Sequence, residues 1–363
     1  ISASQLEKFN LCRFSYFCNY GLNVRERQRA EINPMQYGTI VHYILERFFG
    51  EYTKEEYLSL EEDKFQKIVC AYLTEYAVKY FGEEQLESNS FTYRLKTILD
   101  NVMYLMKHIM EELSQSEFFV ADCELKIGED IPSYTIVLPD GHKIAVCGSV
   151  DRVDIMQRAD ITYLRIIDYK TGTKQFKLSD ILYGINLQML LYLHSIEVSG
   201  GDKYGEIVPA GILYMPATVP YISSDSLKSI DKLPDELNKK LKMNGLLLKD
   251  TEIIHGMDKT DVATYIPVKI KAGEPVSSTS LATLAEFGKI FKKVDMLIAE
   301  MGKNIYNGNI EAKPLKGGHD SCEYCPYDSV CAYRQSNPIT CFSVDNKTVI
   351  EEITNEINGK EEE

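Results

Sequence analysis

The sequence predicts an α/β fold in which a mixed β-sheet is flanked by helices, and three observations predict it. Helical periodicity runs through most of residues 1–115. Short strand-like segments with period-two alternation follow between residues 134 and 170. A long amphipathic segment at 281–308 then predicts one more helix, which ends at Gly308.

The first third of the chain is expected to be mostly helical. The periodicity predicts helices over 4–22, 33–52, 54–81 and 84–115. In the second of these, His42 and Glu46 are four residues apart and share a helical face. A neutral imidazole at His42 is a potential metal ligand, although a single histidine in a helix is more often a core residue with a hydrogen-bond partner.

Three consecutive antiparallel strands are expected next. The segments "YTIVL" and "KIAVCGSVDRVDIM" flank a Pro-Asp-Gly turn, and "QRAD" leads from the second into "ITYLRIIDYKTG". A helix over 179–197 and a strand over 210–215 follow, whereas 222–278 show no clear element. The acidic end of the chain, 350–363, is expected to be solvated or frayed.

Composition limits the function classes. The chain has 363 residues and a formal charge of −14, which disfavours an extensive nucleic-acid-binding surface, although "NVRERQRAE" is locally basic. No apolar run is long enough to span a membrane. There is no signal peptide and no P-loop motif, and nine cysteines crowded toward one end favour metal binding in a reducing compartment. We expect a cytoplasmic protein and, because the sequence starts at Ile1 within a capped helix, a segment of a longer chain.

Two carboxylates and a lysine are predicted to converge beside the hairpin turn. Asp168 and Lys170 are two apart on a strand, so they point to one face. Folding back at the turn brings Asp151 within a position or two of Asp168. Carboxylate oxygens suit Mg²⁺ or Mn²⁺, and a lysine can orient water or offset charge on a phosphorane. Charges at the end of a buried strand are costly unless they are paired or metal-bound, which favours this interpretation over an ordinary surface hairpin.

A second polar pair lies on the helix after this strand. Gln188 and Tyr192 are four apart and share a face that can hold a phosphate or a base. The alternative interpretation is an ordinary half-polar helix face.

The segment "CEYCPYDSVC" carries three cysteines with the spacing of metal ligands. These are Cys322, Cys325 and Cys331, and a tetrahedral site needs a fourth. By spacing, the candidates are the nearby Cys341 or, from the first helix, Cys12 or Cys18. The other cysteines (Cys70, Cys123 and Cys147) lie in helix or strand patterns and are expected in the core.

The motifs G-x-x-x-H at 38–42, "GSVDRVD", "DYKTG" and Q-x-x-x-Y at 188–192 together resemble the RecB-family branch of the PD-(D/E)XK nucleases. The opening "SASQLEKFNLCRFSYF" combined with "CEYCPYDSVC" is similar to the iron–sulfur nuclease domains of AddAB-type helicase–nucleases, and the resemblance covers essentially the whole chain.

This resemblance implies a set of roles. The catalytic divalent metal would be bound by His42, Asp151, Asp168 and the carbonyl of Tyr169, and Lys170 would be the catalytic lysine. Gln188 and Tyr192 would lie beside the site, with Asp154 and Glu46 secondary. A [4Fe–4S] cluster would be held by Cys12, Cys322, Cys325 and Cys331, with zinc as the alternative metal.

The implied domain organisation has four parts. They are a helical region at 1–115 carrying Cys12 and His42, a nuclease core at 116–215, a part with the iron–sulfur cysteines at 216–349, and the acidic tail at 350–363. The implied function is Mg²⁺-dependent hydrolysis of DNA, single-stranded by resemblance, together with an AddA-type helicase partner in double-strand-break repair. The alternatives are a freestanding single-strand exonuclease and a catalytically silent DNA-binding module with a structural cluster.

Overall fold

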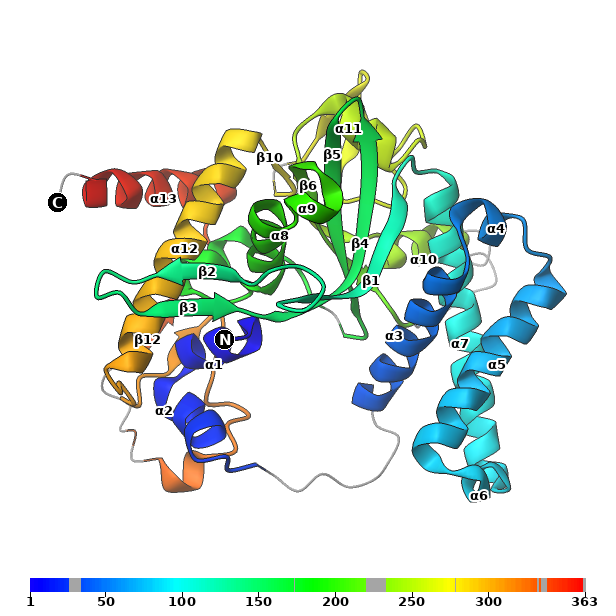
Figure 1. Cartoon of the computed structure of the whole chain (residues 1–363), viewed down its shortest axis with the longest axis horizontal. Helices are drawn as coiled ribbons and strands as arrows, with labels where there is room; N and C mark the ends of the chain where they lie inside the picture. The colour runs from blue at the N-terminus through cyan, green and yellow to red at the C-terminus, as the bar shows by residue number, and fades with distance from the viewer. Residues whose placement is uncertain are drawn as a thin grey trace.

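The computed structural model describes residues 1–25, 34–172, 174–219, 233–277, 279–331, 333 and 338–361, and Figure 1 shows the chain. Most of the basic segment predicted near the N-terminus, 23–31, lies outside the described residues. In the described part of the chain, no helix is long and apolar enough to cross a membrane.

A six-stranded mixed sheet forms the centre of the molecule. The strand order is β1-β4-β5-β6-β7-β10. Its strands are β1 (Phe119–Ile127), β4 (Gly148–Arg158), β5 (Ile161–Lys170), β6 (Glu206–Pro216), β7 (Asn244–Leu248) and β10 (Leu281–Ala282). The β1–β4 and β4–β5 pairs are antiparallel and β5–β6 is parallel, which makes the sheet mixed as the sequence predicts.

Helices cover both faces of this sheet (Figure 1). On one side lie α3 (Pro34–Glu51), α4 (Lys54–Leu58), α5 (Glu62–Phe81), α6 (Glu83–Leu86) and α7 (Asn89–Ser114). On the other side lie α8 (Gln188–Ser199) and α12 (Leu284–Tyr306). Their apolar residues join the sheet in one continuous core, so a single packing unit supports the central strands.

Smaller elements complete the described part of the chain. The two-stranded sheets are β2–β3 (Tyr134–Val137, Lys143–Val146), β8–β9 (Lys269–Lys271, Glu274–Val276) and β11–β12 (Leu315–Gly317, Ile339–Cys341). The short helices and helical turns are α9 (Gly201–Tyr204), α10 (Leu233–Leu241), α11 (Thr251–Met257), η2 (Leu178–Tyr183) and η4 (Asp328–Val330).

The first predicted helix is broken, and the prediction of one continuous helix over 4–22 was wrong. A capping box at Ser2 starts α1 (Ala3–Leu11), but Cys12 has an extended backbone with φ −169° and ψ 119°. The chain then resumes as α2 (Arg13–Tyr16) and the π-helical turn η1 (Phe17–Gly21). The Ser321 hydroxyl donates to the Leu11 carbonyl at 2.9 Å, so contact with a segment far along the chain satisfies the group that the break frees.

Two further expectations are corrected at helix boundaries. The helix predicted over 179–197 starts only at Gln188, because Gly184 and Asn186 have positive φ angles of 67° and 54° and interrupt it. The acidic end is not frayed within the described residues: it forms α13 (Asn346–Glu361), which buries Val349, Ile353 and Ile357. Apolar residues spaced four apart give this helix a buried stripe, Glu351 and Glu352 are exposed, and Glu356 pairs with the buried Lys293 of α12.

The strand β1 was not predicted, and the predicted strand over 143–156 is split. In "CELKI", Cys123, Leu125 and Ile127 alternate with Glu124 and Lys126, which is the strand signal that was missed. The split falls between β3 and β4, where the amide of Cys147 donates to the carbonyl of Ile1.

Candidate active site

Three carboxylates lie in one row across the neighbouring strands β1, β4 and β5. In β1, Cys123 and Leu125 pair with Arg152 and Val150, which puts Glu124 opposite Asp151. One step beyond the pair Arg152–Ile167, Asp151 lies opposite Asp168. Directly opposed residues in antiparallel strands point to the same face, so the sheet register itself gathers this acidic group.

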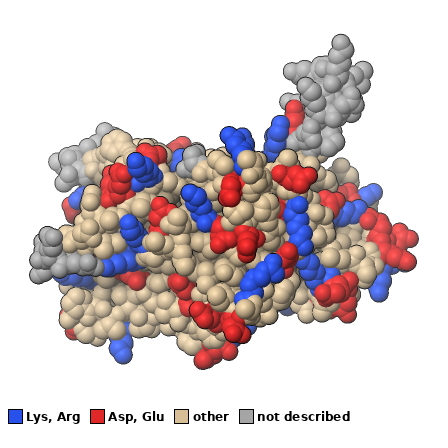
Figure 2. Space-filling model, turned by 90° about the horizontal axis from the view of Figure 1, so that it is seen from above, with Lys and Arg blue, Asp and Glu red and all other residues tan. Residues whose placement is uncertain are grey.

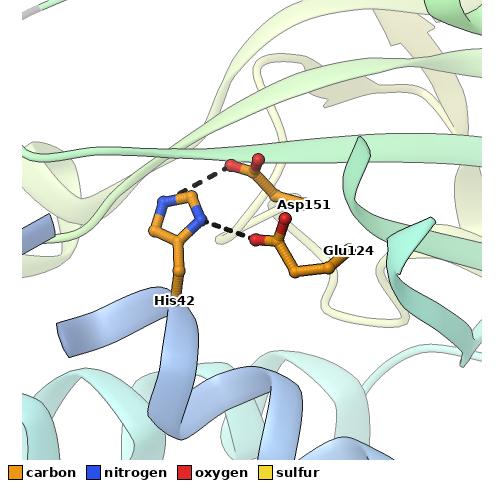
Figure 3. Close-up of side chains that lie close together, drawn as sticks. All are labelled: His42, Glu124 and Asp151. Atoms are coloured by element: carbon orange, nitrogen blue, oxygen red, sulfur yellow. Dashed lines mark hydrogen bonds and ion pairs between the residues drawn. The ribbon is translucent and has the colours of Figure 1, made fainter. Parts of the chain in front are cut away.

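His42 reaches this row from helix α3. Its Nδ1 lies 3.0 Å from Oε1 of Glu124, and its Nε2 lies 3.6 Å from Oδ2 of Asp151. Figure 3 shows the imidazole between the two carboxylates. Glu124 is held in turn by the Ser149 hydroxyl, which donates to its Oε2 at 2.8 Å. One ligand atom from each of His42, Glu124 and Asp151 fits within 4.8 Å of the others.

This donor set fits a hard divalent cation. Donors bound to Mg²⁺ at about 2.1 Å in octahedral geometry lie roughly 3 to 4 Å apart, and Nε2 of His42 and Oδ2 of Asp151 are 3.6 Å apart. A histidine that binds a metal commonly has its other ring nitrogen held by a carboxylate, as Glu124 holds His42. The residues present therefore fit a metal ion without rearrangement of the backbone.

Asp168 and Lys170 lie beside this group. Asp168 is 3% exposed, and Lys170 Nζ forms an ion pair with its Oδ2. The Tyr169 amide between them donates to Oδ2 of Asp151 at 2.9 Å. The predicted convergence of Asp151, Asp168 and Lys170 is thus seen in the geometry, while their catalytic roles and the Tyr169 carbonyl as a ligand stay predictions.

Crowding of negative charge shifts the protonation of these groups. Burial and the neighbouring charge of Asp168 raise the pKa of Asp151 to about 7. Burial opposes protonation of His42, but its hydrogen bond to Glu124 and the charge of Asp151 outweigh it and raise the pKa of the imidazole. A cation bound here would replace a proton and relieve this repulsion.

Gln188 and Tyr192 occupy different surroundings on α8. Gln188 is the first residue of the helix, and its backbone N–H donates to Oε1 of Glu7. Tyr192 is 4% exposed and lies directly against Gly148, at the start of the strand that carries Asp151. Tyr192 therefore lies near the site, as the resemblance implies.

The opposite face of the same strands carries a fully buried ion network. Arg152 and Arg165 donate to Asp154 and to Glu112 of α7 at distances between 2.6 and 3.1 Å. Burial opposes the charge on Asp154, but the two guanidinium groups outweigh it and hold the pKa of this carboxyl below its usual range. Asp154 therefore serves the packing of α7 on the sheet and does not face the site.

A groove of about 930 Å³ opens over the site. His42, Glu124, Tyr169 and Lys170 line it, together with Glu46 on α3. Residues from α5 form a further part of its wall. Its volume is at the upper end of the range typical of ligand pockets.

The four cysteines implied by the resemblance line one small cavity. Cys12, Cys322, Cys325 and Cys331 surround a space of about 150 Å³. Cys341, the nearest candidate by spacing, instead accepts a hydrogen bond from the His319 amide and is not part of this lining.

Cys18 is also outside that lining, although it lies near Cys325 and Cys331. Burial and then the charges of these two cysteines raise the pKa of its thiol. The geometry thus groups Cys12 with the three later cysteines, whereas the cluster itself stays a prediction.

Comparison with known proteins places this geometry in a family. Residues 1–332 match the model of the PD-(D/E)XK nuclease superfamily. The chain belongs to this superfamily. The family and the fold predicted from the motifs are therefore confirmed.

Named relatives are similar over nearly the whole chain. The B-type subunit of the ATP-dependent helicase/deoxyribonuclease from Thermoanaerobacter sp. (strain X514) is 35% identical over 92% of this chain and 30% of its own length. The proteins of the same name from Alkaliphilus oremlandii and Clostridium kluyveri are 33% and 34% identical over 98% and 100% of this chain, which correspond to 32% of each relative. The chain thus spans about a third of the length of these relatives.

Glu124 is the site residue that sequence reasoning missed. Its strand was not recognised, and Glu124 has a left-handed φ of 50° in β1, whose register shifts between Val120 and Asp122. The alternation in "CELKI" could have located the strand, but only pairing with β4 brings Glu124 to His42.

Proposed function

We propose that this chain is a metal-dependent deoxyribonuclease that hydrolyses phosphodiester bonds of single-stranded DNA. The observation that carries the proposal is the pairing of His42 with Asp151 and of Lys170 with Asp168, beside a groove that His42 and Lys170 line. Three hard or borderline donors and an ammonium group are the parts that metal-assisted phosphodiester hydrolysis requires.

The position of each residue determines the role that we assign to it. His42, Asp151 and Asp168 would hold Mg²⁺ or Mn²⁺, with the Tyr169 carbonyl as a further ligand, and Glu124 would fix the orientation of the imidazole through Nδ1. The bound ion supplies charge stabilisation and lowers the pKa of a water molecule. Lys170, beside Asp168, orients the attacking water and offsets negative charge on the phosphate. Tyr192 would support the site from α8 through its contact with Gly148, and Gln188, by the resemblance, would act from the start of the same helix.

The cysteine cavity supports a [4Fe–4S] cluster over zinc. A tetrahedral zinc ion with bonds of about 2.3 Å needs its sulfur ligands about 3.8 Å apart. Among the residues that the structure describes, no three cysteine sulfurs lie within 4.8 Å of one another. A four-iron cluster binds each thiolate to a different iron and spreads the sulfurs more widely, in agreement with the open cavity at Cys12 and Cys322–Cys331.

The relatives' names support a cellular role for this activity. They are named as one subunit of a helicase/deoxyribonuclease, and we propose that the chain corresponds to the nuclease domain of such an AddB protein. It would act in the cytoplasm with an AddA-type helicase partner, which supplies DNA strands during double-strand-break repair.

The test is cleavage of a labelled single-stranded oligonucleotide by variants of the chain with Mg²⁺ or Mn²⁺. We expect Asp168→Asn and Lys170→Ala each to lower the cleavage rate at least about 100-fold, because each removes a group that acts on the reacting phosphate or water. Asp160→Asn, an exposed carboxylate at the far end of the same hairpin, is the matched control and should keep full activity. Cleavage by Asp168→Asn at the parent rate would contradict the proposal.

A further inference from the structure

An aromatic wall lines the groove beside the metal site. Tyr43 of α3 and Tyr76 and Tyr80 of α5 line the same cavity as His42 and Lys170. Their rings form a continuous series, with centroid separations of 5.2 Å between Tyr43 and Tyr76 and 4.4 Å between Tyr76 and Tyr80. The catalytic groups and the aromatic series therefore face one shared space.

Burial changes along this series. Tyr76 is 6% exposed, whereas Tyr80 is 56% exposed although its ring is large and largely apolar. Tyr80 thus has one side supported by Tyr76 and a large open surface toward the groove. A ring held in this way offers a flat surface to a second ring system at little loss of conformational entropy.

The inner end of the series is held rigidly. The Tyr43 hydroxyl donates to Oε1 of Glu75 at 2.9 Å, and Arg47 Nη1 pairs with the same oxygen at 3.0 Å. These contacts join α3 to α5 and fix the position of the wall relative to His42, which lies next to Tyr43 on α3. Preorganisation of this kind favours binding, because ordering the wall needs no further free energy.

The charges around the wall favour a ligand that binds by stacking. Lys79 Nζ lies 5.2 Å from the Tyr80 ring centroid, and Lys126 and Lys174 line the groove, but Glu46 and Glu124 line it as well. The whole chain carries a formal charge of −14, and on the upper face drawn in Figure 2 acidic and basic side chains are interspersed. With lysines and glutamates both lining the groove, attraction of phosphates by a broad basic surface is weak, whereas base–aromatic stacking does not depend on net charge.

We propose that Tyr80, backed by Tyr76, is a stacking platform for an unpaired nucleobase of the DNA strand whose phosphate occupies the His42–Asp151–Asp168 site. Lys79 would contact the phosphate next to the stacked base. Because a base in a duplex has its faces covered by neighbouring pairs, such a platform selects strands with unpaired bases and tolerates any sequence. This inference rests on the proposed function and adds a specific binding element to it.

The experiment measures binding of fluorescent oligodeoxythymidylate to the 363-residue chain carrying Asp168→Asn, so that the strand is not cleaved. Adding Tyr80→Ala should weaken binding about 5- to 100-fold, the range for loss of one stacked base. Tyr80→Phe keeps the ring and should bind as the parent does. The fold-loss from Tyr80→Ala should be similar at low and high salt, because stacking releases few counterions.

Two controls separate stacking from a general effect. Tyr93→Ala removes another exposed ring, 72% exposed on α7 and outside the groove lining, and should leave affinity unchanged. A strand of the same length with abasic sites should bind the parent more weakly and lose little further affinity with Tyr80→Ala.

The inference is overturned if Tyr80→Ala binds as tightly as Tyr93→Ala, if abasic and thymidylate strands bind the parent equally, or if the parent shows no measurable binding. Cleavage by the chain without substitutions is measured separately. If that chain cleaves single-stranded DNA but the binding experiment gives one of these overturning results, only the stacking proposal is contradicted. If the chain does not cleave single-stranded DNA, the proposed function is contradicted.

Discussion

At the scale of single residues, Gly148 shows how close packing dictates a residue type next to the site. Gly148 starts β4, three residues before Asp151, and an added Cβ would lie 2.1 Å from Oη and 2.4 Å from Cζ of Tyr192. Its backbone φ is not positive, so the close approach of Tyr192, and not backbone freedom, requires glycine here. The glycine of "GSVD" and the tyrosine of Q-x-x-x-Y are thus one packing unit.

We predict that Gly148→Ala lowers the free energy of unfolding by about 1–3 kcal/mol, because the buried Tyr192 ring must shift to make room. Urea unfolding followed by circular dichroism measures the change. Gly288→Ala in α12 is the control: no atom lies within 4 Å of its added Cβ, and it should raise stability by about 0.5–1 kcal/mol. If Gly148→Ala were as stable as the parent, the Tyr192 ring would be able to shift away from the added methyl group without a measurable loss of stability.

At the scale of elements, one histidine ties a hairpin and two helices together on the far side of the sheet from α3. His194 of α8 lies between Glu197 of the same helix and Asp295 of α12, at 3.2 and 3.3 Å. Its ring stacks on Phe291 with centroids 4.6 Å apart, and Tyr134 of β2 donates to Asp295 at 2.7 Å. Burial opposes protonation, but the two carboxylates outweigh it and raise the pKa of His194 to about 9.

This cluster predicts a pH-dependent stability. The pKa of His194 in the folded state exceeds the unfolded value of about 6.5, so its contribution is fully present below pH 6.5 and is lost as the pH rises through about 9. The loss is on the order of 3 kcal/mol. Denaturant unfolding between pH 6 and 10 should show this decline, and His194→Gln should remove it, whereas the exposed His255→Gln should keep it. An unchanged decline in His194→Gln would assign it to other groups.

Element prediction succeeded where a local signal was strong and failed where distant contacts decided. The hairpin β4–β5 and the helices α3 and α12 follow directly from periodicity and turn residues in the sequence. The break at Cys12 does not, because the freed Leu11 carbonyl is satisfied by Ser321, 310 positions away. The same holds for α13, whose buried stripe needs α12 and the rest of the core to cover it.

At the scale of the whole molecule, the proposed cluster closes the chain on itself. Cys12 lies just after α1, and its partners Cys322, Cys325 and Cys331 lie near the end of the chain. Further contacts join the two regions, such as the Tyr327 hydroxyl donating to the Val24 carbonyl at 2.7 Å. Metal ligation between them would constrain the unfolded chain as a long-range crosslink does.

We predict that Cys12→Ala loses the bound iron and lowers the free energy of unfolding by up to about 6 kcal/mol, the loop-entropy value for a crosslink of this span. Iron content and the melting temperature measure the two effects. The control is Cys70→Ala, an exposed cysteine on α5 that should alter neither quantity. If iron and melting temperature were unchanged in Cys12→Ala, Cys12 would not be a ligand.

The sequence by itself determined the family and the hairpin that carries Asp151, Asp168 and Lys170, because these depend on local spacing and on motifs. Spacing left the fourth cysteine open, and Cys12 was chosen only by resemblance, so the ligand set stays a prediction. Only the tertiary structure decided that Glu124 joins His42, that Asp154 turns to the opposite face, and that Tyr80 borders the same groove as His42 and Lys170. The physical reason is that strand register and helix docking set these neighbours, and both depend on burial of apolar surface between segments that lie far apart along the chain.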